Sequence, residues 1–466
     1  MSTLQEARDR ASKVRPHPRQ VLWNQMEFYA FVHFGLYTFG IDVENQKQVD
    51  LGMFNPAQLD ADQWVSAFKA AGMTGLILTC KHHEGFCLWP SRYTEFSVRN
   101  TPWRDGRGDV VREVSDACRR QGLKFGVYLS PWDMTEKTYG TPEYDIYFKN
   151  QLRELLTNYG EVFCVWFDGA NRSKTGVQNY DWDGYYRLIR ELQPNAAICI
   201  CGPDVRWIGN EAGISREEEW SVVPEEIMKT ERNPGYWRNI DSIPNSTWKD
   251  LGSAEFIRNY PRLIWYPAEV DVSIRPGWGY SQADDDQVKS LNELMYIYEK
   301  AVGGNANLLL NVPPDPRGLL MNQDVNRLAE LGSEIHKMFE RDQTPGCRIV
   351  DESNRPVETL LDSSRESFYA GGRTPVLTVT FPEKREFNLI RLKETIENGQ
   401  QIEKFSIEIP DGDGWQSVFA GTTIGYQKFC RFRKCVSDRL RIRVIQSRGS
   451  VSLTQIGIYD DEERAL

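Results

Sequence analysis

The sequence predicts an α/β fold, a (β/α)8-like TIM barrel followed by a smaller all-β domain. Short apolar runs rich in β-branched and aromatic residues alternate with amphipathic stretches, the pattern of βαβ units around a parallel sheet. The length of 466 residues suits a barrel of about 250–350 residues plus a module of about 100. Near Thr344 the pattern changes to short alternating runs separated by Gly, Asp and Asn turns. We therefore predict a catalytic barrel at 1–343 and a jelly-roll-like β-sandwich at 344–466.

The expected barrel elements follow one another in regular order. The first strand and its exit lie at Phe28–Tyr37. Further strands are expected at Gly75–Cys80, Lys124–Leu129, Val162–Phe167, Ala196–Cys201, Leu263–Trp265, Val270–Ile274 and Ala306–Val312. Helices are expected at Asp60–Ala71, Asp109–Gln121, Asp145–Tyr159, Tyr180–Leu192, Asp285–Ala301 and Asp324–Arg341. Residues 203–260 lack a clear period and are expected to be irregular.

The C-terminal strands are expected from period-2 alternation, without a helix among them. They lie at Val376–Phe381, Phe387–Leu392, Ile402–Ile409, Leu440–Ile445 and Val451–Tyr459.

Composition narrows the function classes. The formal net charge of -10 argues against a nucleic-acid partner, and no stretch approaches the roughly 20 apolar residues of a membrane span. The N-terminal residues carry no apolar signal core, so we expect a cytoplasmic protein, with a secreted form that has lost its signal left open. Nine Cys without a CxxC pair, several within expected strands, predict buried free thiols. Composition leaves the oligomeric state open, and we expect no cofactor.

Three of the five His fall near strand ends, where the functional side chains of such a barrel gather. His33 follows the first strand, and His82 and His83 follow the second. Imidazole both donates and accepts hydrogen bonds, which predicts binding of sugar hydroxyls. The competing hypothesis is a metal site. The HHE run lacks HExxH spacing, and adjacent residues of an extended chain point to opposite sides, so we predict no metal there.

Carboxylates are the second kind of candidate. Asp168 follows six apolar residues at the end of the fourth strand, and the next clear helix begins some ten residues later, which argues against a helix cap. Such a carboxylate can act as a base, a nucleophile or an electrostatic stabiliser, and Trp166 on the same strand face is expected in the pocket wall. Glycoside cleavage needs a second carboxyl. Several acidic residues after the fifth strand qualify, and Glu211 stands out because apolar and glycine residues flank it.

These motifs together resemble glycoside hydrolase family 29, the α-L-fucosidases. The resemblance rests on FVHFGLYTFG with Glu44, KHHEGFCLWPS, FGVYLSPWD and VWFDGAN, and extends from about Arg19 to Asp342. It implies a double displacement with net retention. Asp168 matches the nucleophile of the WFDG motif.

The same resemblance assigns a sugar pocket. His33, His82 and His83 match residues that hold fucose hydroxyls, and Glu44 matches an acidic residue after strand one, although the Trp that commonly follows it is absent. Tyr128 and Trp166 are expected to line the pocket.

RWIGNEAG, EEWSVVP and VDVSIRPGWGY resemble the branch that acts on α-1,3/1,4-linked fucose. In that branch the acid/base matches Glu211, and Arg275 and Trp278 are expected to reach the sugar. The C-terminal domain resembles a module that accompanies many members, and we favour a packing role over carbohydrate binding. Two alternatives stay open: a barrel glycosidase for another sugar, and a glycan-binding protein without turnover.

Overall fold

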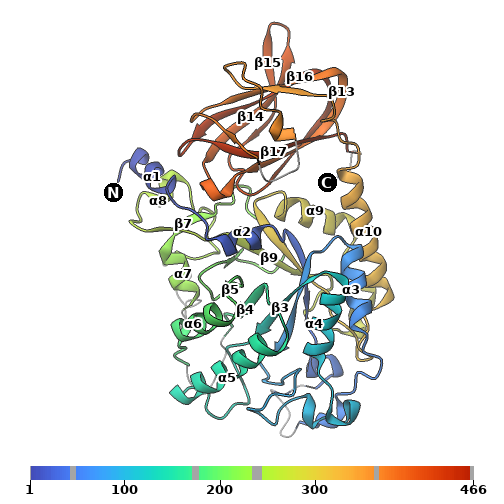
Figure 1. Cartoon of the computed structure of the whole chain (residues 1–466). Helices are drawn as coiled ribbons and strands as arrows, with labels where there is room; N and C mark the ends of the chain where they lie inside the picture. Colours follow the sequence, from blue (N-terminus) through green and yellow to red (C-terminus); the bar gives the residue numbers. More distant parts are fainter. Residues whose placement is uncertain are drawn as a thin grey trace.

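A computed structural model of the chain describes residues 2–41, 43, 49–170, 178–232, 244–361 and 367–461. Figure 1 shows an α/β barrel with an all-β domain stacked on one of its ends. The predicted fold class is confirmed. No helix of the described ranges is long and apolar enough to cross a membrane.

The barrel is an eight-stranded parallel sheet whose strands neighbour each other in chain order. Its strands are β1 (Phe28–Val32), β2 (Gly75–Lys81), β3 (Lys124–Leu129), β4 (Cys164–Phe167), β5 (Ala197–Ile200), β6 (Arg206–Trp207), β9 (Ala268–Ser273) and β10 (Ala306–Asn311). β10 pairs with β1, and a single parallel bridge between Cys199 and Val205 joins β5 to the start of β6, so the sheet nearly closes. Every residue of β1, β2 and β10 is buried, as expected for parallel strands covered on both faces.

Helices cover the outside of the barrel. They are α3 (Ala61–Ala70), α4 (Val110–Gln121), α5 (Pro142–Asn158), α6 (Trp182–Leu192), α9 (Leu291–Ala301) and α10 (Asn322–Met338). Aspartates cap three of them: Asp60, Asp109 and Asp181 accept a backbone N–H in the first turn of α3, α4 and α6. Since Asp181 caps α6, Asp168 is not the cap of that helix. The helix expected at Asp285–Ala301 is in fact a 3₁₀ segment, Gln282–Gln287, followed by α9.

The structure differs from the sequence prediction around the fifth and sixth strands. The region expected to be irregular contains β6, β7 (Val222–Pro224), α7 (Glu225–Glu231) and α8 (Ala254–Ile257). β8 (Leu263–Trp265) is a strand as expected, but it pairs antiparallel with β7 outside the barrel. The N-terminal helices α1 (Leu4–Ala11) and α2 (Pro18–Asn24) were also missed. Each is too short to show a period, and both begin at a capping box that sequence reasoning did not weigh.

The C-terminal domain is one antiparallel sheet folded around its own core. Its strands are β11 (Arg348–Val350), β12 (Tyr369–Ala370), β13 (Val376–Glu394), β14 (Ile402–Asp411), β15 (Gly414–Gly421), β16 (Lys428–Ser447) and β17 (Ser452–Tyr459). The two runs expected at Val376–Phe381 and Phe387–Leu392 form one long strand. It pairs with β16 on both sides of register shifts between Thr380 and Leu389, where bulges bend the pair.

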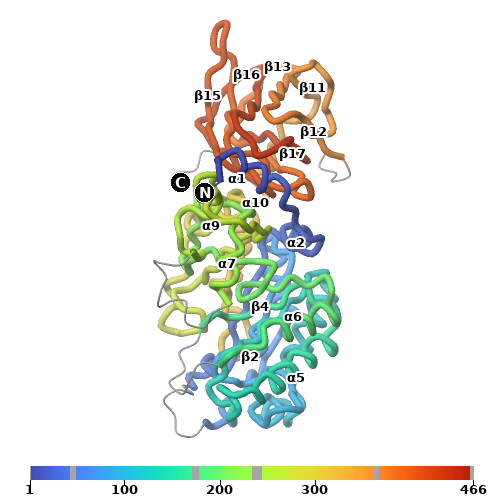
Figure 2. The backbone as a smooth tube through the Cα atoms, turned by 90° about the vertical axis from the view of Figure 1, so that its left-hand side faces the viewer, coloured from blue at the N-terminus to red at the C-terminus, as the bar shows by residue number. Residues whose placement is uncertain are grey.

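The two domains share a separate apolar cluster. Ile396 and Tyr426 from the β domain pack with Val222, Ile257 and Trp265. Helix α1 adds two buried alanines to this cluster and lies between the domains in Figure 2. Because this end of the barrel carries the first residues of the strands, the β domain sits opposite the strand ends that bear the candidate site.

Candidate active site

A pocket opens where the barrel strands end. Its volume is about 760 Å³, within the usual range for small-molecule sites. The aromatic, imidazole and acidic side chains that line it are Phe31, His33, Tyr37, His82, His83, Glu84, Trp132, Trp166, Asp168, Glu211, Asp271, Trp278 and Tyr280. The structure therefore brings together the sequence-predicted His33, His82, His83, Trp166, Asp168, Glu211 and Trp278.

Asp168 leaves the end of β4 with its carboxylate held from two sides. Oδ1 accepts the backbone N–H of Ala170 at 2.7 Å, and Oδ2 accepts the hydroxyl of Tyr128 at 3.0 Å. Burial, with Asp168 alongside, raises the pKa of Tyr128 well above its ordinary value, so this phenol stays a proton donor. Nε2 of His83 lies 3.7 Å from Oδ2. The carboxylate is thus oriented while about a quarter of its side chain remains accessible from the pocket.

His33 is fixed in one neutral tautomer. Its Nδ1 lies 2.8 Å from Oδ1 of Asn311, whose Nδ2 donates to the carbonyl of Trp278 at 2.8 Å. Since that amide orientation leaves an acceptor facing the ring, His33 carries its proton on Nδ1. Burial, followed by the neighbouring His82, lowers the pKa of His33 to about 3. Nε2 is therefore an acceptor at neutral pH, suited to a ligand hydroxyl.

His82 and His83 are oriented by different partners. His82 stacks on Tyr128 with an interplanar angle of 11°, and its Nδ1 lies 3.3 Å from Oε2 of Glu84. His83 Nδ1 lies 2.8 Å from Oγ of Ser130, which donates its own proton to the carbonyl of Trp132. Nδ1 of His83 is therefore the donor in that bond, and Nε2 faces the pocket. Each imidazole thus has one nitrogen fixed by the protein.

Glu211 also lines the pocket and lies at the turn of a loop that follows β6. Oε2 accepts the indole N–H of Trp278 at 3.1 Å. The expectation that Glu211 lies in a partly apolar setting is wrong, because Glu211 is exposed at the pocket mouth. The flanking glycine has another role: Gly209 has φ 106°, and a Cβ there would lie 2.2 Å from the carbonyl oxygen of Ser246. The glycine therefore permits the sharp turn and adds no apolar cover.

Two more carboxyl groups line the inside of β9. Asp271 lies in the pocket wall and accepts the indole N–H of Trp207 at 2.7 Å. Glu269 lies deeper and accepts the indole N–H of Trp166 at 2.6 Å and the hydroxyl of Tyr29. Burial raises the pKa of Glu269 to about 7 and that of Asp271 well above its ordinary value. Sequence reasoning counted both only among several acidic candidates, although their spacing of two places them on one strand face.

Of the predicted sugar-binding residues that the structure describes, Tyr128 and Arg275 are absent from the pocket lining. Arg275 is buried and absent from the pocket lining, because its guanidinium binds Asp324 at 2.9 Å and Asp285 at 2.8 Å. The prediction that Arg275 reaches the sugar is therefore wrong. Glu44 lies outside the described residues.

A metal ion would find one candidate set of ligands in the described part of the chain. His82, His83 and Asp168 each offer one ligand atom, and these atoms lie within 4.8 Å of one another. The same groups surround the carboxylate that Tyr128 orients, so a sugar hydroxyl and an ion would compete for them. This donor set is compatible with either ligand.

A (β/α)-barrel whose strand ends gather carboxylates, imidazoles with fixed tautomers and indole rings has the site of a glycoside hydrolase. The sequence profile described as alpha-L-fucosidase matches residues 5–338. The chain belongs to the alpha-L-fucosidase family.

Similar proteins agree with this assignment. "Alpha-L-fucosidase 1" of Arabidopsis thaliana is 35% identical, and the match covers 99% of this chain and 92% of that protein. The crystal structure of a putative alpha-L-fucosidase from Bacteroides ovatus has a TM-score of 0.88 at 41% identity, covering 99% of this chain and 77% of that chain. A Ruminococcus gnavus GH29 fucosidase in complex with fucose has a TM-score of 0.85 at 27% identity, covering 97% and 95% of the two chains.

Proposed function

We propose that this α-L-fucosidase is a retaining enzyme that releases terminal α-1,3/1,4-linked fucose by double displacement. The observation that carries the proposal is that two carboxyl groups, Asp168 and Glu211, line one pocket at the ends of the barrel strands. Asp168 is oriented by Tyr128 on β3 and by the backbone N–H of Ala170 after β4, and Glu211 is oriented by the indole N–H of Trp278. Retaining glycosidases need one carboxylate as nucleophile and one carboxyl as acid.

In the first step the Asp168 carboxylate attacks the anomeric carbon. The bond from that carbon to the leaving oxygen breaks as Glu211 transfers its proton to that oxygen, leaving a fucosyl ester on Asp168. In the second step Glu211, now a carboxylate, takes a proton from water. The water oxygen attacks the anomeric carbon and the ester bond breaks, which returns Asp168 and restores the proton on Glu211. Two inversions give net retention.

The remaining pocket groups suit a 6-deoxy sugar. Nε2 of His33 accepts from a hydroxyl, and the pocket-facing nitrogens of His82 and His83 bind others. Phe31 packs against Trp166 and His33 with ring centroids 5.2 and 4.5 Å away. Such an apolar wall supports recognition of the C6 methyl group, which distinguishes fucose from galactose. The fucose bound to the Ruminococcus gnavus relative is consistent with this preference.

The nucleophile is tested by replacing Asp168 with Ala. We expect hydrolysis of p-nitrophenyl α-L-fucoside to fall by about 10⁴-fold or more, because the covalent step is lost. Added azide should restore part of the turnover and give the inverted fucosyl azide, since the small anion occupies the space of the carboxylate. Near wild-type hydrolysis by Asp168→Ala would contradict the assignment.

The linkage preference is tested with a substrate panel. We expect cleavage of Lewis a and Lewis x trisaccharides with a kcat/KM at least about tenfold above that for α-1,2-fucosyllactose. Fucose should also inhibit better than galactose. Equal cleavage of all three oligosaccharides would remove the α-1,3/1,4 assignment while leaving the fucosidase activity in place.

A further inference from the structure

The loop that carries Glu211 ends beside the β domain. We define the Glu211 loop as residues 206–221. Arg206 pairs with Ala268, the first residue of β9, and Ala212 pairs antiparallel with Val272 after the turn. At about 3.3 Å per residue, the four-residue step from Ala268 to Val272 places the turn about 13 Å along β9 from the base of the loop. A small tilt at the base therefore displaces Glu211.

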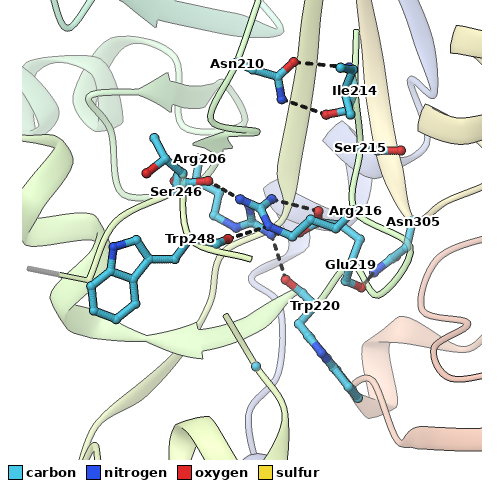
Figure 3. A network of polar contacts seen from close by, with 12 residues as sticks. Arg206, Asn210, Ile214, Ser215, Arg216, Glu219, Trp220, Ser246, Trp248 and Asn305 are labelled. Carbon is cyan, nitrogen blue, oxygen red and sulfur yellow. Dashed lines mark hydrogen bonds and ion pairs between the residues drawn. The ribbon is translucent and has the colours of Figure 1, made fainter. Parts of the chain in front are cut away.

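The tip of the loop is held together by its own contacts. Oδ1 of Asn210 accepts from the backbone N–H groups of Ala212 and Ile214 at 3.0 and 3.2 Å, and its Nδ2 donates to the carbonyl of Ile214 at 2.8 Å. Figure 3 shows this clasp at the tip and a second cluster around Arg216 at the base. The bridge to Val272 and the hydrogen bond from Ser215 to the carbonyl of Lys300 also hold the tip. The direction of Glu211 therefore depends on these contacts together with those at the base.

A buried ion cluster ties the two ends of the loop together. Glu219 pairs with Arg206 on β6 and with Arg216, the latter at 3.0 Å. The side chains of Arg206 and Glu219 are almost completely buried. Arg216 also donates to the carbonyl of Trp248 at 2.8 Å and to that of Ser246 (Figure 3). The cluster makes the base of the loop one rigid unit.

The β domain contacts the base of the loop directly. Gln400, which is fully buried, accepts the backbone N–H of Ser221 at 2.8 Å and donates to the carbonyl of Glu219 at 3.2 Å. The guanidinium of Arg448 lies 4.1 Å from the ring centroid of Trp220. These contacts bind consecutive residues of the loop base.

Lys428 adds a contact near the surface, where its Nζ donates to the carbonyl of Glu217 at 3.0 Å. Asn305, just before β10, contacts both the Glu211 loop and the β domain. It donates to the carbonyl of Glu219 at 2.9 Å and accepts the backbone N–H of Tyr426 at 2.7 Å.

We propose that the C-terminal β domain, through Gln400, is a positioning element for Glu211 and so for protonation of the leaving oxygen. Gln400 touches neither substrate nor the reacting atoms; it acts through the Glu211 loop. The proposal rests on the proposed role of Glu211 as acid/base. It assigns the β domain a role in catalysis that needs no glycan bound to that domain.

The test compares two substrates whose leaving groups differ in their need for a proton. A loss of proton donation affects only one of them, whereas a folding defect affects both. Gln400→Met keeps the side-chain volume but removes both hydrogen bonds. We expect kcat/KM on a Lewis a trisaccharide, whose leaving oxygen needs a proton, to fall about tenfold or more. On 2-chloro-4-nitrophenyl α-L-fucoside, whose leaving group departs without a proton, kcat/KM should stay within about threefold of the wild type. Lys428→Met should change the ratio of the two values in the same direction by a smaller factor.

The matched control is Gln416→Met. Gln416 is an exposed residue of β15, which lies at the far end of the β domain (Figure 1), so the change should leave kcat/KM for both substrates unaltered. An equal loss on both substrates, or a loss on neither, would overturn the positioning role. If Gln400→Met does not fold, an unchanged ratio for Lys428→Met overturns it instead.

Glu211→Ala, measured in parallel, distinguishes a failure of the acid/base assignment from a failure of the positioning role. If Glu211→Ala loses both substrates equally, the acid/base assignment fails and the positioning role fails with it. If Glu211→Ala discriminates between the substrates and Gln400→Met does not, only the positioning role is overturned.

Discussion

Single side chains at the barrel mouth divide into those that face the pocket and those that hold the mouth in shape. Phe31, His33 and Trp166 present ring edges and faces to one space, whereas Arg275 turns to Asp285 and Asp324 behind it. Position along the chain does not explain this difference, since Arg275 lies only three residues from pocket-lining Trp278. The ion pairs of Arg275 with Asp285 and Asp324 explain it. A basic residue near a sugar site is therefore not by itself a sugar ligand.

Arg275→Met should destabilise the fold and leave substrate binding intact. Removing one partner of a buried ion pair leaves Asp324 uncompensated, so we expect a loss of about 3–5 kcal/mol in the free energy of unfolding. KM for p-nitrophenyl fucoside, measured well below the melting temperature, should stay within about twofold of the wild type, because Arg275 adds no atom to the pocket lining. Chemical denaturation and steady-state kinetics check the two parts. A raised KM with unchanged stability would restore the sugar-binding role predicted from the sequence.

Much of the site could be predicted because barrel strands deliver their following residues to one end. Asp168, His33 and the His82–His83 pair needed only the positions of their strands. The spacing of Glu269 and Asp271 also placed them on one strand face. The exposure of Glu211 could not be predicted in this way, because it depends on β6 and the loop after it, and a two-residue strand shows no periodicity.

At the scale of elements, β9 contributes chemistry to the barrel interior as well as backbone pairing. Its alternate residues Glu269 and Asp271 point inward, where indole N–H groups of Trp166 and Trp207 bind them. Acidic residues inside a barrel oppose the expectation of an apolar core, and the indole partners are what make them tolerable. The two indoles come from β4 and β6, so β9 is tied across the interior as well as to its neighbours.

Glu269 makes stability depend on pH. Its pKa of about 7 in the fold exceeds its ordinary value of 4.5, so the folded chain keeps a proton that the unfolded chain releases. Stability from this group is therefore complete below about pH 4.5 and is lost as the pH rises through 7, up to about 3 kcal/mol. Glu269→Gln mimics the neutral acid: its oxygen accepts from Trp166, and the bond to Tyr29 reverses, so that the amide donates to the phenol oxygen. We expect it to match the wild type at pH 4.5 and to be more stable at pH 8.

Thermal melting across that pH range checks the expectation for Glu269. The exposed Glu255→Gln serves as the control and should follow the wild type throughout. A Glu269→Gln variant that is less stable than the wild type at both pH values would mean that the charged form is the native one.

For the whole molecule, the sequence predicted two domains but not how they join. Periodicity reports which face of an element is buried, but it does not identify the element packed against it. The joint is formed by helix α1, the β7–β8 pair and the turn at Ile396, segments distant in sequence and each too short to show a pattern. Lys393 and Tyr426 of the β domain both donate to Glu27, just before β1, at 2.8 Å. The β domain is thus tied to the first barrel strand and to the Glu211 loop.

This joint predicts that the two domains unfold together. Both domains supply side chains to one apolar cluster, so unfolding of one domain exposes the apolar surface of the other and destabilises it. Calorimetry of the wild type should therefore give a single transition. Ile396→Ala removes a buried side chain from the shared cluster, at a cost of about 2–4 kcal/mol, and should separate the barrel and β-domain transitions. Ile407→Ala makes the same chemical change inside the core of the β domain alone. It should lower the midpoint while the transition stays single, because the joint is untouched. If both variants shift one undivided transition by the same amount, the shared cluster is not what couples the domains, and other contacts, such as those of Glu27 with Lys393 and Tyr426, maintain the cooperative unfolding.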